Sequence, residues 1–264
     1  MMITTMLTNI STKLVDFLER LGRSGLFLLI GLYKIITPPY KIYPIIKQIH
    51  FIGAQSFLVI LLSGTFVGMV IALLFYDTLV RFGSVAMLGS AVGISLVWEL
   101  GPVLTALVVI GRAGSATCAE IAVMRNEQQI DALECMAIDP YKYVVAPRLI
   151  AAIICVPILT AIFVTAGIVG GYFVGVGLFG VSPGSFINGM YDTVHIRDII
   201  MGTTKSFTFG VIMIWIATTK GFHLHLHPAG SYGSEGVSKV TTEAVVLSSI
   251  LVLFSDFIVS AIIL

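Results

Sequence analysis

Charged side chains are scarce in this sequence. Lysine, arginine, aspartate and glutamate make up 11% of the 264 residues, whereas 57% are hydrophobic and the mean hydropathy is +1.02. A soluble domain carries about 25% charged residues. Because so few charges cannot cover an aqueous surface, lipid must solvate much of the chain. The net charge of +1 provides no broad basic field, which argues against nucleic acid as a partner.

Motifs for covalent or metal chemistry are also missing. The three cysteines, Cys118, Cys135 and Cys155, are an odd number without metal-type spacing, so we expect small apolar residues rather than disulfides. The sequence has no G-x-x-x-x-G-K-[ST] phosphate loop, and residues 202–206 only loosely resemble one. It also offers no Ser/His/Asp, Cys/His or paired-carboxylate constellation. We therefore predict that the chain needs no cofactor and is not itself an enzyme.

Long uncharged runs are present instead. Residues 51–76 carry no charge and are long enough to cross a bilayer with some tilt. Further spans are predicted at 82–111, from 149 to about 177, at 199–219 and at 244–264. The fold class is therefore an all-α membrane protein with five transmembrane helices and no separate soluble domain.

The first 50 residues differ from the rest. Apolar residues at helical spacing from Leu7 to Leu21 predict an amphipathic helix on the membrane surface. Charges precede the first apolar run and no cleavage site follows it, so we expect no signal peptide. Residues 24–33 are too few to span and are interpreted as an interfacial or re-entrant elbow helix. We therefore divide the chain into 1–50, the amphipathic and elbow helices, and 51–264, the five-helix transmembrane domain.

The distribution of basic residues predicts the orientation. If the N-terminus is cytoplasmic, inside segments hold twelve of the fifteen lysines and arginines, leaving Arg81, Arg197 and Lys205 outside or within a span. The positive-inside rule then places the polar loop at 112–148 in the cytoplasm and the C-terminus on the far side.

Glycines recur four residues apart in three of the predicted spans. These small faces allow helix backbones to approach closely in lipid. They fit either packing within one chain or part of a dimer seam. The pairs and triplet are Gly64 and Gly68, Gly89 and Gly93, and Gly167, Gly171 and Gly175.

The loop at 112–148 predicts a short cytoplasmic helix over residues 120–137, which contain no glycine or proline. The dipeptide Asp139-Pro140 is expected to end it. Apolar residues from Ile121 to Ala137 form a stripe with an acidic flank, which suits docking into a groove on a partner protein. The alternative is a solvated helix packed on its own bundle.

This region closely resembles the MlaE/YrbE family, the permeases of ABC transporters that move phospholipids between the two membranes of Gram-negative bacteria. The family pattern reads roughly ELGP, then GRxGSAxxAE, then MRxxEQIDALExMxxDPxxYxxxPR. The matching stretches here are residues 99–102, 111–116, 119–120, 124–134, 136–141 and 147–148. The resemblance covers most of residues 50–264.

The resemblance implies a permease subunit in the inner membrane. Its partners would be an ABC ATPase subunit (MlaF-like), a periplasmic MCE-domain subunit (MlaD-like), a STAS-domain accessory subunit (MlaB-like) and a second copy of the chain, and its substrate would be a phospholipid. The loop helix would be the coupling helix that docks on the ATPase. The residues assigned to coupling are Glu120, Met124, Arg125, Glu127, Gln128, Asp131, Leu133, Glu134 and Asp139.

Three charged residues, Glu99, Lys205 and Asp256, lie inside predicted spans, where such groups usually face a cavity or a partner. For Glu99 we weigh a lipid-cavity contact against a helix-packing hydrogen bond; the family often has a basic residue immediately before it, where this chain has Trp98. Lys205 and Asp256 could form a structural pair. Residues expected to line the lipid path are Trp98, Glu99, Leu100, Ile71, Phe75, Leu79 and Phe82.

Two alternatives remain open. The same buried charges would serve an ion-coupled secondary transporter, although no inverted repeat is visible. The histidines at 223, 225 and 227 alternate and could bind a metal such as zinc, but this lies in a turn where the family has no metal site. We therefore predict no metal site.

Overall fold

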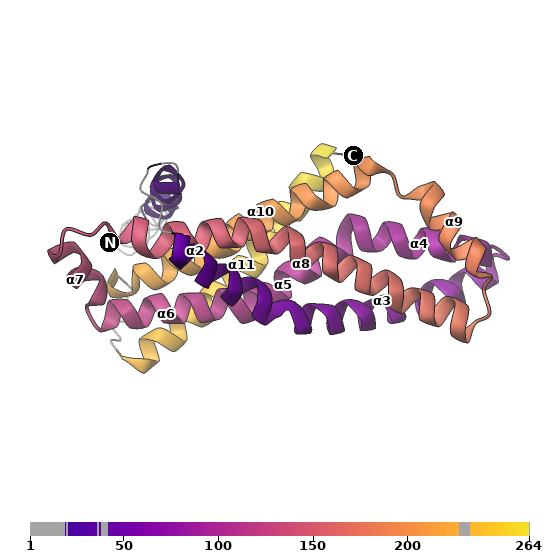
Figure 1. The fold of residues 1–264 in the computed structure, drawn as a ribbon, viewed down its shortest axis with the longest axis horizontal. Helices are drawn as coiled ribbons and strands as arrows, with labels where there is room; N and C mark the ends of the chain where they lie inside the picture. Colours follow the sequence, from indigo (N-terminus) through magenta and orange to yellow (C-terminus); the bar gives the residue numbers. More distant parts are fainter. Residues whose placement is uncertain (1–18, 20, 36, 38–41, 227–232, 264) are drawn as a thin grey trace, which may run out of the picture.

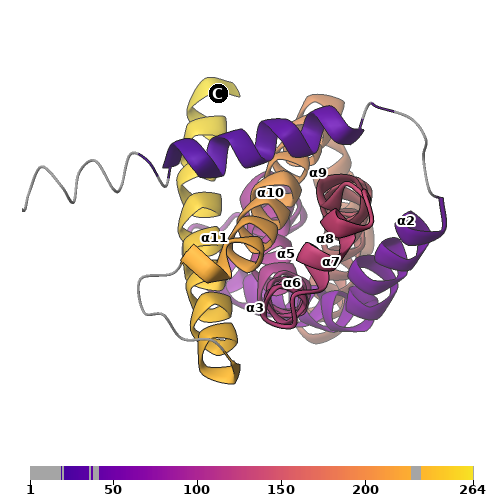
Figure 2. The same ribbon diagram turned by 90° about the vertical axis from the view of Figure 1, so that its left-hand side faces the viewer.

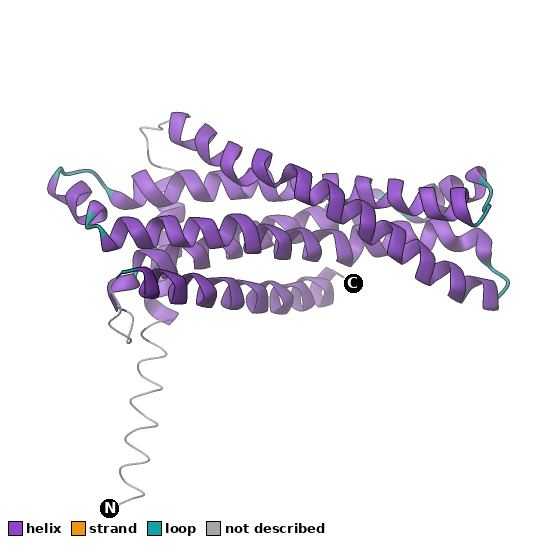
Figure 3. Ribbon diagram, turned by 90° about the horizontal axis from the view of Figure 1, so that it is seen from below, coloured by secondary structure: helices purple, strands orange, loops and turns teal. Residues whose placement is uncertain are grey.

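The computed structural model describes residue 19 and residues 21–35, 37, 42–226 and 233–263. In these residues every regular element is a helix, and the connecting loops are short (Figure 3). Five helical segments are long and apolar enough to cross a membrane, and they run side by side as a bundle (Figure 1). They are Ile42–Arg81, Val85–Asn126, Tyr141–Leu178, Ile196–Phe222 and Ser234–Ile262, here called spans 1 to 5. The all-α membrane fold is thus confirmed.

Several spans extend beyond the uncharged runs. Span 1 begins nine residues before the predicted start, so the division at residue 50 falls inside a continuous helix. Span 2 runs on through Arg112 to Asn126. A helix does not stop where the first charge appears, because arginine and lysine can lie along it and reach polar partners.

Spans 1, 2 and 3 are each built from several helical pieces, whereas spans 4 and 5 are single helices. Span 1 comprises α2 (Ile42–Ile49), η1 (His50–Ala54) and α3 (Gln55–Arg81). Span 2 comprises η2 (Val85–Met87), α4 (Leu88–Ser95), η3 (Leu96–Leu100), α5 (Gly101–Val109), η4 (Ile110–Gly114) and α6 (Ser115–Asn126). Span 3 comprises η5 (Tyr141–Val145), α8 (Ala146–Tyr172) and η6 (Phe173–Leu178); spans 4 and 5 are α10 (Ile196–Phe222) and α11 (Ser234–Ile263). The elements η1, η3, η4, η5 and η6 are π-helical turns, which often occur at functional positions.

Glycines bring α3 and α8 into backbone contact. A Cβ atom added to Gly64 would lie 2.6 Å from the carbonyl oxygen of Phe163, and one added to Gly68 would lie 1.8 Å from that of Gly167. No larger residue fits there without separating the two helices. The small face of span 1 therefore serves packing within the chain, and the alternative of a dimer seam on this face is wrong.

The remaining glycine faces are also filled from within. A Cβ atom at Gly89 would lie 2.0 Å from the carbonyl oxygen of Phe186, and one at Gly93 would lie 2.7 Å from the side chain of Met190. Both contacts are made by α9 (Pro183–Thr193), which packs on α4. On span 3, Gly171 and Gly175 face Val92 and Leu88.

The helix α9 was not predicted. The helix begins directly after Ser182: the hydroxyl of Ser182 accepts a hydrogen bond of 3.1 Å from the backbone N–H of Ser185, and Pro183 occupies the first helical turn. These are usual features of a helix N-terminus. The helix α9 lies at the end of the bundle opposite α7 (Gln129–Cys135) (Figure 1).

The predicted elbow is a helix over residues 21–35. Viewed along the bundle, it lies across α10 rather than beside it (Figure 2). Trp215 of α10 donates a hydrogen bond of 2.8 Å to the carbonyl of Ser24, and the buried Phe27 contacts the rings of Tyr141 and Phe222. The crossing geometry confirms a helix that does not span. The amphipathic stretch at 7–20 lies outside the described residues.

Candidate functional site

The three charged side chains that lie inside the spans predicted from the sequence meet in one cluster. The ammonium group of Lys205 on α10 lies 2.6 Å from a carboxylate oxygen of Glu99 on η3 and 2.9 Å from one of Asp256 on α11. The Lys205 side chain is completely buried, whereas those of Glu99 and Asp256 are 42% and 18% exposed. The predicted Lys205–Asp256 pair is therefore confirmed, and Glu99 joins it.

Pro102 explains why Lys205 is also bonded to the backbone. In an α-helix the carbonyl of Trp98 would accept from the amide of residue 102, but proline has no N–H. Lys205 supplies the missing donor, with its ammonium nitrogen 3.0 Å from the Trp98 carbonyl oxygen. The π-helical turn η3 and the proline together open the backbone at the position where Glu99 lies. The opening of span 2 near Pro102 is thus a local change of helix type.

The exposed side of the cluster belongs to Glu99. Its second carboxylate oxygen accepts a hydrogen bond of 3.1 Å from the hydroxyl of Ser260, which also bonds the carbonyl of Asp256 at 2.8 Å. The Glu99 side chain as a whole is 42% exposed. The indole nitrogen of Trp98 is buried without a hydrogen-bond partner among the described residues. Leu100 packs against the core.

The four residues of span 1 that were expected to line a lipid path have different environments. Ile71 is 9% exposed and belongs to the core, and Phe75 and Leu79 pack against that core while remaining partly exposed. Phe82 is 76% exposed. Of these four side chains, Phe82 is therefore the most open to an acyl chain in this conformation.

The predicted helix at 120–137 is broken into two. The first part is the end of α6, continuous with span 2, and the second is the seven-residue helix α7. Between them Gln128 has a φ of 57°, in the left-handed region that non-glycine residues seldom adopt. The expectation of one uninterrupted helix is wrong, and the loop ends in a short, separate helical element.

The C-terminal end of α7 is also defined by a left-handed residue. Ala137 has a φ of 59°, and its amide bonds the carbonyl of Glu134 at 2.9 Å. The amide of Ile138 bonds the carbonyl of Leu133 at the same distance. These two bonds form a Schellman motif, which ends the helix before the predicted stop at Asp139-Pro140.

The apolar stripe of this loop faces the chain's own bundle. Ile121 and Ile130 are fully buried, and Met124 and Leu133 pack against the core. The docking surface predicted from this stripe is therefore wrong, and the alternative of a helix packed on its own bundle is confirmed. The residues left exposed at the tip are Glu127, Gln128, Gln129, Asp131, Ala132, Glu134, Cys135, Met136 and Ala137, with Met136 62% exposed.

Arg125 holds the tip in place. One guanidinium nitrogen lies 2.6 Å from a carboxylate oxygen of Asp131, and another donates to Nδ1 of His225 at 3.1 Å. The guanidinium also lies 5.6 Å from the centre of the Phe222 ring. Of the residues expected to contact a partner, Arg125 is thus engaged within the chain, and it fixes α7 against the end of α10.

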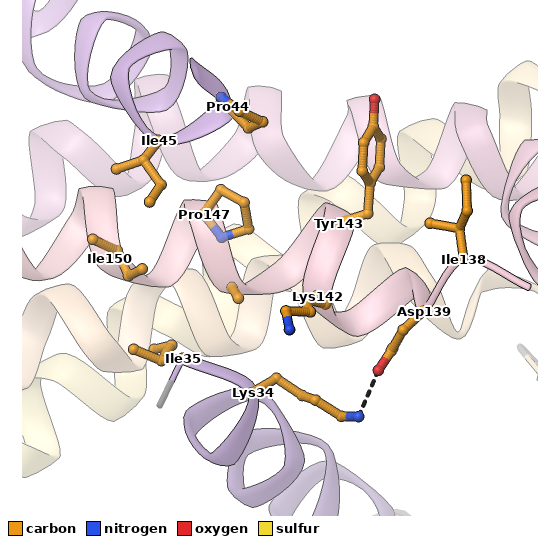
Figure 4. Close-up of a pocket in the computed structure, with 11 residues that line it drawn as sticks. Lys34, Ile35, Pro44, Ile45, Ile138, Asp139, Lys142, Tyr143, Pro147 and Ile150 are labelled. Carbon is orange, nitrogen blue, oxygen red and sulfur yellow. Dashed lines mark ion pairs between the residues drawn. The ribbon is translucent and has the colours of Figure 1, made fainter. Parts of the chain in front are cut away.

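Two further ion pairs tie this end together. Glu120 pairs with the buried Arg148 at 2.8 Å, linking α6 to the start of α8. Asp139 pairs with Lys34 of the N-terminal helix at 2.6 Å (Figure 4). Burial would raise the pKa of the Asp139 carboxyl, but its bond to Lys34 and the backbone N–H groups of Tyr141 and Lys142 hold that pKa below its ordinary value.

Arg112 contributes a contact that sequence reasoning did not assign. It donates to the carbonyl of Phe51, to the side chain of Gln55 and, at 3.1 Å, to the hydroxyl of Ser56. The guanidinium also lies 5.0 Å from the centre of the Phe51 ring. Its place in the GRAGSA stretch, residues 111–116, was the sequence feature that could have pointed to this arginine. This arginine joins spans 1 and 2 where both contain π-helical turns.

The alternating histidines form no metal site among the described residues. The rings of His223 and His225 lie 6.4 Å apart, and Nδ1 of His225 accepts from Arg125. Burial lowers the pKa of His223, and burial together with the nearby Arg125 cation lowers that of His225. His227 lies outside the described residues.

The fold and this ion cluster define a multi-pass, all-α membrane protein with charged groups buried between its spans. The family model described as Permease MlaE matches residues 45–262. The chain therefore belongs to the MlaE permease family.

Individual relatives agree with this assignment. The intermembrane phospholipid transport system permease protein MlaE of Haemophilus influenzae is 43% identical, over 99% of this chain and 98% of that protein. A probable ABC transporter permease protein of Rickettsia typhi is 37% identical over 93% of both chains. The chloroplastic protein TRIGALACTOSYLDIACYLGLYCEROL 1 of Arabidopsis thaliana is 32% identical over 82% of this chain and 60% of that protein.

Proposed function

We propose that this chain is the permease subunit of an ABC transporter that moves phospholipids between the inner and outer membranes, driven by a separate ATPase subunit. The family and the relatives' names support this function. The structural observation that carries the coupling mechanism is the short helix α7, which projects at the end of the bundle and is held to span 2 by the Arg125–Asp131 ion pair.

The tip of the α7 region is the proposed contact with the ATPase. Its exposed side chains are mostly acidic or amide groups, with Met136 as an apolar projection among them. Glu120, Arg125 and Asp139 act differently, since each ties the loop to another element through an ion pair. Movement of α7 is therefore transmitted to the bundle rather than absorbed by a flexible loop.

The proposed lipid path passes the accessible side of the buried ion cluster. Glu99 is its central polar group, because its side chain is partly exposed although Lys205 is fully buried. Trp98 and Leu100 flank it on the same turn, and Phe82 offers an exposed ring at the far end of span 1. Ile71, Phe75 and Leu79 would join the path only if the helices move, because they now pack on the core.

The basic residues support an orientation in which the α7 end faces the cytoplasm and the C-terminus of α11 faces the periplasm. We further propose that two copies of the chain pair and clasp the lipid between them, with MCE-domain and STAS-domain subunits as accessory partners. Span 5 supports pairing, because it is the span whose apolar window is least buried, at 11%.

An ion-coupled transporter remains the second class of function to test. The buried charges motivated it, but in the structure Lys205 is paired with both carboxylates. The relatives named above as permeases of ABC transporters favour the ATP-driven mechanism.

The coupling role is tested by substituting Ala132, an exposed residue of α7 whose amide donates to the carbonyl of Gln128 at 3.0 Å. Ala132→Pro removes this N–H and breaks the helix, whereas Ala132→Ser keeps it and is the matched control. In proteoliposomes containing the complete transporter, Ala132→Pro should abolish lipid-stimulated ATP hydrolysis and lipid transfer, and Ala132→Ser should retain both. Normal transport by Ala132→Pro would show that α7 is not the coupling element.

A further inference from the structure

The π-helical turn η1 leaves one carbonyl of span 1 without its usual donor. In an α-helix the amide of Gln55 would donate to the carbonyl of Phe51, four residues earlier. In η1 this amide donates instead to the carbonyl of His50, five residues earlier, as in a π-helix. The Phe51 carbonyl has therefore lost its α-helical donor and needs another one.

Arg112 of span 2 provides that donor. Its guanidinium donates to the Phe51 carbonyl, to the side chain of Gln55 and, at 3.1 Å, to the hydroxyl of the buried Ser56. Arginine suits this task because its five N–H groups are held in a rigid, planar fork. Within the described part of the chain, Arg112 makes all the side-chain hydrogen bonds between spans 1 and 2.

The π-helical turn η4, which contains Arg112, is satisfied differently. The amide of Ser115 donates to the carbonyl of Ile110, five residues earlier, so the Gly111 carbonyl also loses its α-helical donor. The hydroxyl of Ser115 donates to this Gly111 carbonyl. Span 2 thus completes its own π-helical turn, whereas the turn in span 1 depends on a side chain of span 2.

The two turns lie between the α7 region and the packed interior of the bundle. On one side of η4, α6 leads to α7, and on the other side α5 leads to the turn that carries Glu99. Beyond η1, backbone contacts at Gly64 and Gly68 pack α3 closely against α8. Helices bend most readily at π-helical turns. A displacement of α6 would therefore move the guanidinium of Arg112 and, with it, the point at which span 1 can bend.

We propose that Arg112 is a positioning residue that transmits movement of the α7 region from span 2 to span 1. This role rests on the proposed function, in which a separate ATPase moves that region. The hydrogen bonds of Arg112 go to η1 and to the beginning of α3, not to the α7 tip or the Glu99 cluster. Arg112 therefore acts through span 1, whose shape it sets, and such a chain of contacts is a physical route for coupling.

In the competing interpretation Arg112 only stabilises the fold. The two roles differ in what they change. A structural role lowers ATP hydrolysis and lipid transfer together, in proportion to the amount of assembled transporter. A positioning role lowers the lipid transferred per ATP hydrolysed and leaves the lipid-independent ATP hydrolysis of the assembled complex unchanged.

The test measures both rates in proteoliposomes that contain the complete transporter. Arg112→Met keeps a long side chain and removes every donor, so it should lower the lipid transferred per ATP about tenfold, the effect of losing one hydrogen bond to a charged group. Arg112→Gln is too short to reach all three acceptors and should lower the ratio as well, which provides a second variant should Arg112→Met not fold. Arg81→Met is the matched control, because this arginine of span 1 forms an exposed pair with Asp77. It should keep the wild-type ratio.

Hydrogen exchange of the purified chain provides a second readout that does not depend on transport. In Arg112→Met the amides of residues 51–57 should exchange faster than in wild type, whereas those of residues 112–118 should not, because Ser115 still satisfies the Gly111 carbonyl. Ser115→Ala should give the opposite pattern.

An unchanged ratio in the Arg112 variants, or equal falls in hydrolysis and transfer, would overturn the positioning role. Equal acceleration of exchange in both segments of Arg112→Met would likewise contradict the one-sided dependence of span 1 on span 2. Absence of ATP-driven lipid transfer by the wild-type transporter would instead contradict the proposed function itself.

Discussion

The ammonium group of Lys205 lies 2.6 Å from the Glu99 carboxylate, and no part of the lysine side chain is exposed. Because Asp256 lies on its other side, at 2.9 Å, this one cation balances two carboxylates from different spans. Replacing the lysine leaves both carboxylates without their counter-ion, and only Glu99 keeps a hydrogen bond, from the hydroxyl of Ser260.

Lys205→Met should therefore destabilise the protein by about 3–5 kcal/mol, the usual loss when one partner of a buried ion pair is removed. Lys220→Met is the matched control on the same helix, because Lys220 pairs with Glu243 at 3.0 Å with both side chains about one-third exposed. It should cost at most about 1 kcal/mol. Unfolding of the purified variants in detergent measures both effects, and equal losses would show that the cluster is not a structural centre.

Gly68→Ala should weaken the contact between α3 and α8. The new methyl group would lie 1.8 Å from the Gly167 carbonyl oxygen, so the helices must move apart, with an expected loss of about 1–3 kcal/mol. At Gly177, also in a helical turn, an added Cβ meets nothing within 4 Å. Gly177→Ala should therefore be neutral or slightly stabilising. Thermal unfolding midpoints of the two variants provide the comparison, and a stable Gly68→Ala protein would contradict the close packing.

The Asp139–Lys34 pair should make the attachment of the N-terminal helix sensitive to acid. The pKa of Asp139 is lowered in the folded protein, so its contribution to stability is fully present above the ordinary carboxyl pKa of about 3.9 and is lost as pH falls through the lowered folded value. Asp139→Asn lacks this contribution. Wild type should unfold at a higher temperature than the variant at neutral pH, and the difference should disappear in strong acid. A constant difference at all pH values would exclude the ionic contribution.

His223 should give a second pH dependence, in a higher range. Burial lowers its pKa, so the folded state disfavours protonation, and stability should fall as pH drops from the ordinary imidazole pKa of about 6.5 through the lowered folded value. His223→Gln should reduce the change of the thermal unfolding midpoint between about pH 8 and about pH 5, a range that brackets the ordinary imidazole pKa of about 6.5. His195→Gln, at the exposed opposite end, is the control. An unchanged slope in His223→Gln would show that this ring does not titrate with folding.

The number and type of spans followed from the sequence because hydrophobic length is a local property. Residues 51–76 needed no knowledge of neighbours to be identified as a membrane helix. The elbow at residues 24–33 could be predicted in the same way, because this run is too short to span a membrane. Lys205 and Asp256 could be identified because they are charged residues within apolar runs. These features depend on whether lipid or water surrounds a segment, and the amino-acid composition of the segment indicates which of the two it is.

What the sequence did not reveal depends on which helices are neighbours. Glu99 joins Lys205 only because η3 and α10 pack together, and Gln128 and Ala137 adopt left-handed conformations without being glycine. The stripe containing Ile121 and Ile130 had the period of a docking face, but the same period also fits burial against the chain's own bundle. Periodicity identifies a buried face; it does not identify what covers it.

The carbonyl of Trp98 lacks its usual helical donor because residue 102 is a proline, and this has a consequence for the biogenesis of the protein. Lys205, which satisfies it, is synthesised 106 residues after Glu99, so the second membrane segment leaves the ribosome long before its counter-ion exists. In newly inserted chains the Glu99 carboxyl group therefore has no counter-ion, and the Trp98 carbonyl has no Lys205 donor, until the last two segments have been inserted. Final assembly of the bundle is consequently a late event, and chains shortened before the fourth segment should be held by insertion factors or degraded.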